Sequence, residues 1–130
     1  MSIWEKNIRK VVPYVPGEQP NMPGMIKLNT NENPYPPAPG VIKALQEFKA
    51  DKLRLYPDPT AKLLAYTLAD YYNVGKDQVF VGVGSDDVLG MSFLTFFNSG
   101  KPILFPDITY SFYDVWAELF SIPFERPKLD

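Results

Sequence analysis

The spacing of apolar residues predicts four helices after residue 39. The first is expected to run from Pro39-Gly40 to near Ala50, with charged residues on its outer face. The second is expected to begin after Thr60, a residue type that caps helix N-termini well. Residues 85–97 are apolar on most sides, so this helix is expected to be buried, and residues 111–120 form a fourth, amphipathic segment. The apolar positions that define the first two helices are Val41, Leu45, Phe48, Leu64, Leu68 and Tyr71.

Short apolar and β-branched runs predict strands between these helices. Residues 79–83 alternate at strand period, residues 102–105 and 122–125 are apolar runs near the C-terminal end of the chain, and residues 25–28 are a further short candidate. Helices and strands that alternate in this way are typical of an α/β fold with mostly parallel strand pairing.

Prolines dominate residues 1–39, which contain eight of the fourteen in the chain. Each proline restricts its own φ and pushes the preceding residue into an extended conformation, so this segment is expected to be an arm that lies on a larger body. Within the arm, Asn29-Thr30-Asn31-Glu32-Asn33-Pro34 forms a polar loop, whose composition by itself favours an ordinary Asx turn before proline.

The junction between the strand at 79–83 and the helix at 85–97 has the features of an anion site. Gly82 and Gly84 permit a tight turn, and Ser85 is the expected N-cap, with Asp86 and Asp87 in the first turn. Unpaired backbone N–H groups at such a helix start suit a phosphate. Taken alone, the junction is equally consistent with a capped connection, because the third glycine of a dinucleotide fingerprint and the Gly-Lys-Ser/Thr of a P-loop are both absent.

Composition removes several classes of chemistry. The chain has no cysteine and no histidine, which excludes disulfides, thiol catalysis, histidine general bases and the usual zinc sites. A formal net charge of -2 without a basic block argues against a nucleic-acid surface. No apolar run is long enough to cross a membrane, and the first residues lack a signal-peptide core, so a cytoplasmic protein is expected.

Five motifs in register resemble the start of the histidinol-phosphate aminotransferases, a family of fold-type-I pyridoxal-phosphate enzymes. Each motif is weak by itself, but their common order and spacing cover nearly the whole chain. The resemblance implies an α/β fold, the N-terminal part of a mixed, mostly parallel sheet flanked by helices, with residues 1–39 as arm and substrate-side loop and 40–130 as the first part of the large cofactor domain. The motifs are Val12-Pro13-Tyr14-Val15-Pro16-Gly17, Leu28-Asn29-Thr30-Asn31-Glu32-Asn33-Pro34, Leu55-Tyr56-Pro57-Asp58, Gly84-Ser85-Asp86-Asp87 and Pro106-Asp107-Ile108-Thr109-Tyr110-Ser111-Phe112-Tyr113.

The resemblance implies that the cofactor is pyridoxal 5'-phosphate and assigns residues to it. Gly84, Ser85 and Asp86 correspond to the phosphate-binding helix start, and Tyr110 to the aromatic residue that stacks on the pyridine ring. Tyr56 corresponds to a tyrosine that reaches the cofactor phosphate of a neighbouring subunit, which implies a homodimer. From the residues alone, the favoured interpretation of Tyr110 is a loop tyrosine that anchors the next helix, and the alternative for Tyr56 is a Tyr-Pro turn that packs on its own domain.

The arm and the polar loop correspond to segments that close over the substrate. Tyr14, Asn31, Glu32 and Asn33 are implied substrate-binding residues, with Glu32 a contact for an imidazole group. Family members often have Asn at the position of Val83 and Glu at that of Asp87, and these two differences weaken the subfamily assignment more than the phosphate site.

The implied activity is amino-group transfer from histidinol phosphate to 2-oxoglutarate in histidine biosynthesis. It needs a Schiff-base lysine and an acidic partner for the pyridine nitrogen, which in the family come after the first 130 positions. None of the ten lysines here lies in a matching motif, so no catalytic residue is assigned, and the 130 residues alone are expected to be inactive. The lysines are Lys6, Lys10, Lys27, Lys43, Lys49, Lys52, Lys62, Lys76, Lys101 and Lys128.

Other interpretations remain open from the sequence. Another fold-type-I enzyme, such as an aromatic aminotransferase or a phosphothreonine decarboxylase, would share the phosphate site. A Rossmann-like nucleotide-binding module would use the turn at 82–86 and could use Asp107 as its ribose-binding acid. A third possibility is a non-catalytic fragment that packs on a partner. If the sheet is truncated, the helix at 85–97 is expected to be poorly covered, which promotes association.

Overall fold

The computed structural model describes residues 3–130, which divide into two compact units. One unit combines the N-terminal segment as far as Tyr14 with Lys62–Asp130, and the other is Val15–Ala61. We call them the main unit and the arm unit. The expected division into an arm at 1–39 and a cofactor domain at 40–130 stays a prediction.

The arm unit contains one α-helix and little other regular structure. Helix α1, Pro39–Gln46, has proline in its first turn and ends earlier than the expected Ala50, where a 3₁₀ helix, Ala50–Arg54, begins instead. The strand expected at 25–28 is wrong: Ile26 and Leu28 are exposed there, and the structure places no second strand beside them. A strand without a neighbouring strand leaves its backbone N–H and C=O groups unpaired. Residues 25–28 therefore do not form a β-strand.

The main unit contains the remaining elements. After a short 3₁₀ helix, Ile3–Asn7, near the N-terminus, its helices are α2 (Lys62–Tyr72), α3 (Ser85–Phe96) and α4 (Phe112–Phe120), and its strands are β1 (Ile103–Leu104) and β2 (Phe124–Glu125). The predicted N-cap of α2 is wrong, because Thr60 instead bonds Asp58 through both its N–H (3.0 Å) and its hydroxyl (2.8 Å). This local turn gives the N–H and the hydroxyl of Thr60 their hydrogen-bond partner, and the helix begins only at Lys62.

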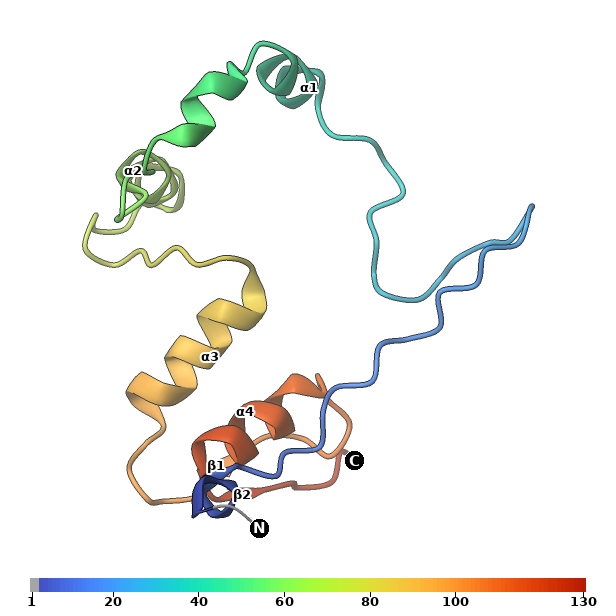
Figure 1. Cartoon of the computed structure of the whole chain (residues 1–130), viewed down its shortest axis with the longest axis vertical. Coiled ribbons are helices and arrows are strands. Elements are labelled where there is room, and N and C mark those ends of the chain that lie inside the picture. The colour runs from blue at the N-terminus through green and yellow to red at the C-terminus, as the bar shows by residue number, and fades with distance from the viewer. Residues whose placement is uncertain (1–2) are drawn as a thin grey trace. The chain divides into compact units, whose positions relative to one another are not determined.

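Strands β1 and β2 form a parallel pair, as the alternation of elements predicts. Ile103 lies opposite Phe124 and Leu104 opposite Glu125, and Ile103 N–H donates to the carbonyl of Pro123 at 2.9 Å. Helix α4 makes the crossover between the two strands (Figure 1). Ser121, with φ of 57°, turns the chain out of α4 and into β2.

The strand expected at 79–83 is absent. The sheet of the described residues has two strands, β1 and β2, and neither lies against this segment. Phe80 is 65% exposed and Val83 is 93% exposed, although their types favour a strand. Valines do alternate with other residues in this segment, but a strand also needs an adjacent strand for its backbone hydrogen bonds. The described residues provide none beside residues 79–83.

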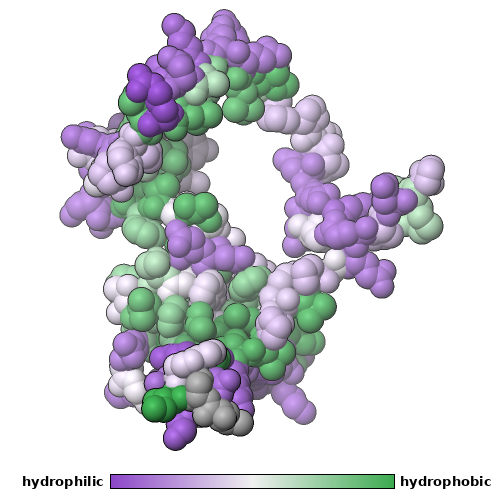
Figure 2. All heavy atoms as spheres, in the orientation of Figure 1, coloured by the Kyte–Doolittle hydropathy of each residue, from purple (hydrophilic) through white to green (hydrophobic). Residues whose placement is uncertain are grey.

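A small apolar core joins α3, α4 and the sheet. Phe93 of α3, Phe105 after β1, Ala117 of α4 and Ile122 before β2 are buried together. The prediction that α3 as a whole is buried is wrong, because only Gly90 and Phe93 are buried and Phe96 is 75% exposed. Figure 2 shows apolar side chains gathered on the surface of this region.

Two phenylalanines on α3 test this core. Phe93→Ala removes a ring that is 5% exposed, and we expect a loss of about 3–5 kcal/mol in the free energy of unfolding, or loss of the fold. Phe96→Ala makes the same change three residues later at an exposed position and is expected to stay within about 0.5 kcal/mol. Urea unfolding, followed by tryptophan fluorescence and by near-ultraviolet circular dichroism, measures both. Equal losses would show that the core is elsewhere.

Candidate functional site

Helix α3 begins at a glycine with a left-handed backbone. Gly84 is the N-cap, with φ of 86° and ψ of 173°, and Ser85 is the first helical residue. The prediction that Ser85 is the N-cap is therefore wrong by one position. The positive φ explains the difference, because glycine adopts this conformation without strain and serine does not. The site residues Gly84 and Ser85 are both exposed.

Asp87 holds the turn that leads into α3. Its carboxylate Oδ2 accepts the backbone N–H of Val83 at 2.9 Å. A Cβ added to Gly82 would lie 2.7 Å from that same oxygen and 2.8 Å from Val88 Cγ2, so a larger residue at this position would displace the Asp87 carboxylate or the Val88 side chain. Asp87 thus has a structural task, similar to the side chain at N3 of a capping box.

The first backbone N–H groups of α3 are available to a ligand. The i→i−4 hydrogen bonds of the helix begin with Val88, whose N–H donates to the carbonyl of Gly84 at 3.3 Å. Ser85 and Asp86 precede it, so their N–H groups have no acceptor within the helix. Together with the positive end of the helix dipole, they form a donor set that suits an oxygen anion.

Tyr110 lies against this helix start. Its hydroxyl donates to Asp86 Oδ1 at 2.8 Å, a contact between residues 24 apart in the sequence. The hydrogen bond to the carboxylate, with smaller effects of burial and of neighbouring charges, raises the pKa of Tyr110 to about 12. The hydroxyl therefore stays protonated at neutral pH, and the sequence-predicted residues Gly84, Ser85, Asp86 and Tyr110 are neighbours in the fold.

A group of aromatic rings supports Tyr110 from the side of α4. The Phe112 ring lies 5.4 Å from the Tyr110 ring with an interplanar angle of 31°, and Tyr113 meets Tyr110 edge-on at 6.0 Å. Tyr113 also contacts Phe93 and Phe105, which belong to the core. In the sequence, Phe112 and Tyr113 stand out only as members of a motif, and the aromatic density of residues 110–113 is the signal that could identify them as part of the site.

Tyr14 joins the same group from the N-terminal segment. Its ring lies 4.5 Å from that of Phe112, which also contacts the Tyr110 ring. Arg9 fastens the segment to the end of α4 by donating to the carbonyl of Leu119 and, at 3.1 Å, to Ser121 Oγ. A guanidinium at a helix C-terminus satisfies carbonyls that have no partner within the helix.

The remaining predicted residues belong to the arm unit. Lys27 donates to the Glu32 carboxylate at 2.5 Å, and this contact lowers the pKa of Glu32. Asn33 Oδ1 accepts the N–H of Tyr35 at 3.0 Å in an Asx turn, and Asn31 has φ of 52°. The Tyr56 side chain is fully exposed. The placement of these residues beside Tyr110 stays a prediction.

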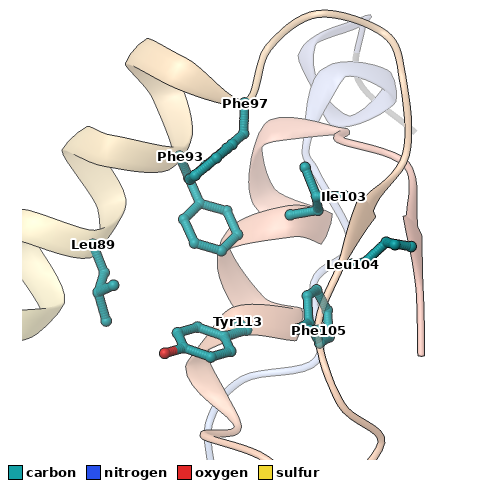
Figure 3. Close-up of a pocket in the computed structure, with 7 residues that line it drawn as sticks. All are labelled: Leu89, Phe93, Phe97, Ile103, Leu104, Phe105 and Tyr113. Atoms are coloured by element: carbon teal, nitrogen blue, oxygen red, sulfur yellow. The ribbon is translucent and has the colours of Figure 1, made fainter. Parts of the chain in front are cut away.

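The main unit also contains an open apolar pocket of about 440 Å³. Figure 3 shows Phe93 of α3 pointing into the space between α3 and β1, with Tyr113 of α4 at one side. Its lining offers neither a cation nor a helix start, so it suits apolar cover and not an anionic ligand. The lining residues are Leu89, Phe93, Phe97, Ile103, Leu104, Phe105 and Tyr113.

Other kinds of site find little support in the described part of the chain. Asp107, the acid that a nucleotide-binding module would use, accepts the N–H of Leu129 at 3.1 Å through its side chain and so has a structural partner. Residues 3–130 contain no group of three or more side chains that could hold a metal ion. The same residues contain no helix with the length and apolarity needed to cross a membrane.

The bond between Tyr110 and Asp86 predicts a pH dependence. Because the pKa of Tyr110 rises from 10.0 to about 12 on folding, the protonated hydroxyl stabilises the folded chain below pH 10, and this contribution is lost as the pH rises towards 12. We expect Asp86→Ala to return the pKa towards 10.0, whereas Asp87→Ala leaves it raised. Ultraviolet titration, with Tyr110→Phe to assign the signal, tests this. An unchanged titration in Asp86→Ala would contradict it.

Comparison with known proteins places the chain in a family. A family model described as aminotransferase class I and II matches residues 23–129. A histidinol-phosphate aminotransferase of Lactococcus lactis subsp. cremoris is 56% identical over 97% of this chain and 35% of its own length. Proteins of that name from Clostridium botulinum (52% identical over 97% of this chain) and Chromohalobacter salexigens (54% over 98%) are each covered over 36% of their length. The chain spans about a third of these curated relatives, and it belongs to the class I and II aminotransferases.

Proposed function

We propose that this chain forms the phosphate- and ring-binding part of a pyridoxal-phosphate-dependent histidinol-phosphate aminotransferase. The observation that carries the proposal is the contact between Tyr110 and Asp86 at 2.8 Å, which puts an aromatic ring beside a helix start with unpaired N–H groups. A phosphorylated planar cofactor needs this combination of groups at one place. The names of the relatives, all histidinol-phosphate aminotransferases, support the choice of reaction.

The residues present fit pyridoxal phosphate. The phosphate would be held by the backbone N–H groups of Ser85 and Asp86, and a Cβ at Gly84 would meet no atom within 4 Å, so the approach to the helix start is open. The carboxylates of Asp86 and Asp87 already accept hydrogen bonds from Tyr110 and Val83, which reduces their repulsion of an anion. Tyr110 would stack on the pyridine ring.

The proposed reaction moves an amino group from histidinol phosphate to 2-oxoglutarate, giving imidazole acetol phosphate and glutamate in histidine biosynthesis. When bound, the cofactor supplies an electron sink for this chemistry. The protein residues bind and orient: Glu32, with its lowered pKa, is a carboxylate that suits an imidazole N–H, and Tyr14, Asn31 and Asn33 would complete the substrate side.

The wider architecture is part of the proposal. The sheet would be the mixed, mostly parallel one of the fold-type-I enzymes, of which β1 and β2 are one parallel pair. Tyr56, fully exposed in the arm unit, would reach the cofactor phosphate of a second subunit in a homodimer, and the protein would work in the cytoplasm. Residues 1–39 would serve as the arm and 40–130 as the first part of the cofactor domain.

The proposed phosphate site can be tested at a single backbone N–H. Ser85 is the first residue of α3, a position that tolerates proline, so Ser85→Pro deletes the N–H donor and keeps the helix start. Ser85→Ala, the matched control, keeps the donor. We expect Ser85→Pro to bind both inorganic phosphate and pyridoxal phosphate roughly tenfold more weakly than Ser85→Ala, measured by equilibrium dialysis, because hydrogen bonds to charged groups are strong.

If the two variants bind alike, the phosphate does not use this helix start. A wild-type chain that binds pyridoxal phosphate no more tightly than inorganic phosphate would contradict the proposed ring contact. Circular dichroism of both variants checks that α3 is intact.

The lysines of the chain predict the outcome of a labelling experiment. None of the ten lysines lies in a motif that matches the Schiff-base lysine of the family, and in the main unit the ammonium group of Lys76 lies over the ring of Tyr66. We expect borohydride reduction of the chain with pyridoxal phosphate to leave no single, fully labelled lysine, and we expect no transaminase turnover from these 130 residues. Peptide mass mapping that finds one defined pyridoxyl-lysine, together with turnover, would refute this.

A further inference from the structure

The first turn of α3 carries two adjacent carboxylates with different partners. Asp87 accepts the N–H of Val83 and so holds the turn before the helix. Asp86 plays no part in capping: its Oδ1 accepts the hydroxyl of Tyr110, which follows β1. Residues of the same type on consecutive positions therefore have separable tasks, one within the turn and the other across the main unit.

Tyr110 is held on several sides and left open on another. Phe112 lies along its ring, and Tyr113, which is packed on the core residues Phe93 and Phe105, meets it edge-on. The backbone fixes one end of the side chain, and the bond to Asp86 fixes the other end. The residue is nevertheless 42% exposed, so these neighbours do not enclose it.

We propose that Asp86 is a positioning residue, whose carboxylate sets the orientation in which the Tyr110 ring meets a planar ligand bound at the start of α3. This inference rests on the proposed function, in which that ligand is pyridoxal phosphate. Two fixed ends define the axis of an aromatic side chain, whereas a tyrosine without a partner for its hydroxyl swings about its Cα–Cβ bond. Ordering the ring before the ligand arrives lowers the entropic cost of stacking.

The charge of Asp86 gives the inference a distinctive signature. A carboxylate at the start of α3 opposes the binding of an anion, so its removal favours phosphate itself. If Asp86 also orients Tyr110, its removal weakens stacking at the same time. Inorganic phosphate and pyridoxal phosphate are therefore expected to respond in opposite directions to one substitution, which general damage to the site would not produce.

Affinities of the 130-residue chain for both ligands provide the test. We expect Asp86→Ala to bind inorganic phosphate at least as tightly as wild type, but pyridoxal phosphate roughly fivefold more weakly, the value of one hydrogen bond. Asp86→Asn, which loses the charge and keeps an acceptor for the Tyr110 hydroxyl, is expected to restore pyridoxal-phosphate binding. The ratio of the two dissociation constants isolates the contribution of the ring.

Two further variants complete the test. Asp87→Ala removes the neighbouring charge and is expected to leave the ratio of dissociation constants at its wild-type value. Tyr110→Phe is expected to change the ratio as much as Asp86→Ala, and the double variant no more than either one, because both single changes break the same bond.

The possible results separate this inference from the proposed function. Equal ratios in Asp86→Ala and Asp87→Ala, or additive effects of Asp86→Ala and Tyr110→Phe, would overturn the positioning role while pyridoxal phosphate still binds. A wild-type chain with no preference for pyridoxal phosphate over inorganic phosphate would overturn the proposed function, and the positioning role with it. Near-ultraviolet circular dichroism identifies any variant that has not folded, and Asp86→Asn then decides the question.

Discussion

The packing of Phe93 against Phe105 and Tyr113 determines where the start of α3 and the loop after β1 lie. These side chains come from α3, from the end of β1 and from α4, so one small cluster ties three elements together. The Tyr113 ring is shared between this core and the site, because it also meets Tyr110 edge-on. Burial of a few aromatic rings thus sets the geometry on which the polar contact between Tyr110 and Asp86 depends.

Both carboxylates in the first turn of α3 accept hydrogen bonds from groups outside the helix. Two acidic residues in a first turn stabilise a helix by interacting with its dipole, but they also compete with an anionic ligand for the same N–H groups. Here Asp87 is engaged by the N–H of Val83 and Asp86 by the hydroxyl of Tyr110. The donors of Ser85 and Asp86 remain available, and the two carboxylates hold the turn and the aromatic ring.

The sequence predicted the local elements well and the pairings only in part. The strands near 103 and 124 and the helices near 85 and 112 are confirmed, because their periodicity and their short separation define them. The prediction of a strand at 79–83 is wrong because the alternation of residue types does not show whether a second strand lies beside the segment. Ser85 is misplaced by one position because composition does not reveal that Gly84 has a positive φ. The motifs suggested Gly84, Ser85, Asp86 and Tyr110, but the bond between Asp86 and Tyr110, and the support from Phe112, required coordinates.

The central claim is that a pyridoxal ring bound to this chain lies on Tyr110 while its phosphate lies at the start of α3. Nuclear Overhauser measurements on the chain with pyridoxal phosphate test it most directly. The account predicts cross-peaks between protons of the pyridine ring and the ring protons of Tyr110, together with shifted amide signals for Ser85 and Asp86. Cross-peaks from the pyridine ring to Phe93 and Phe97, which line the apolar pocket, with no shift at Ser85, would contradict it.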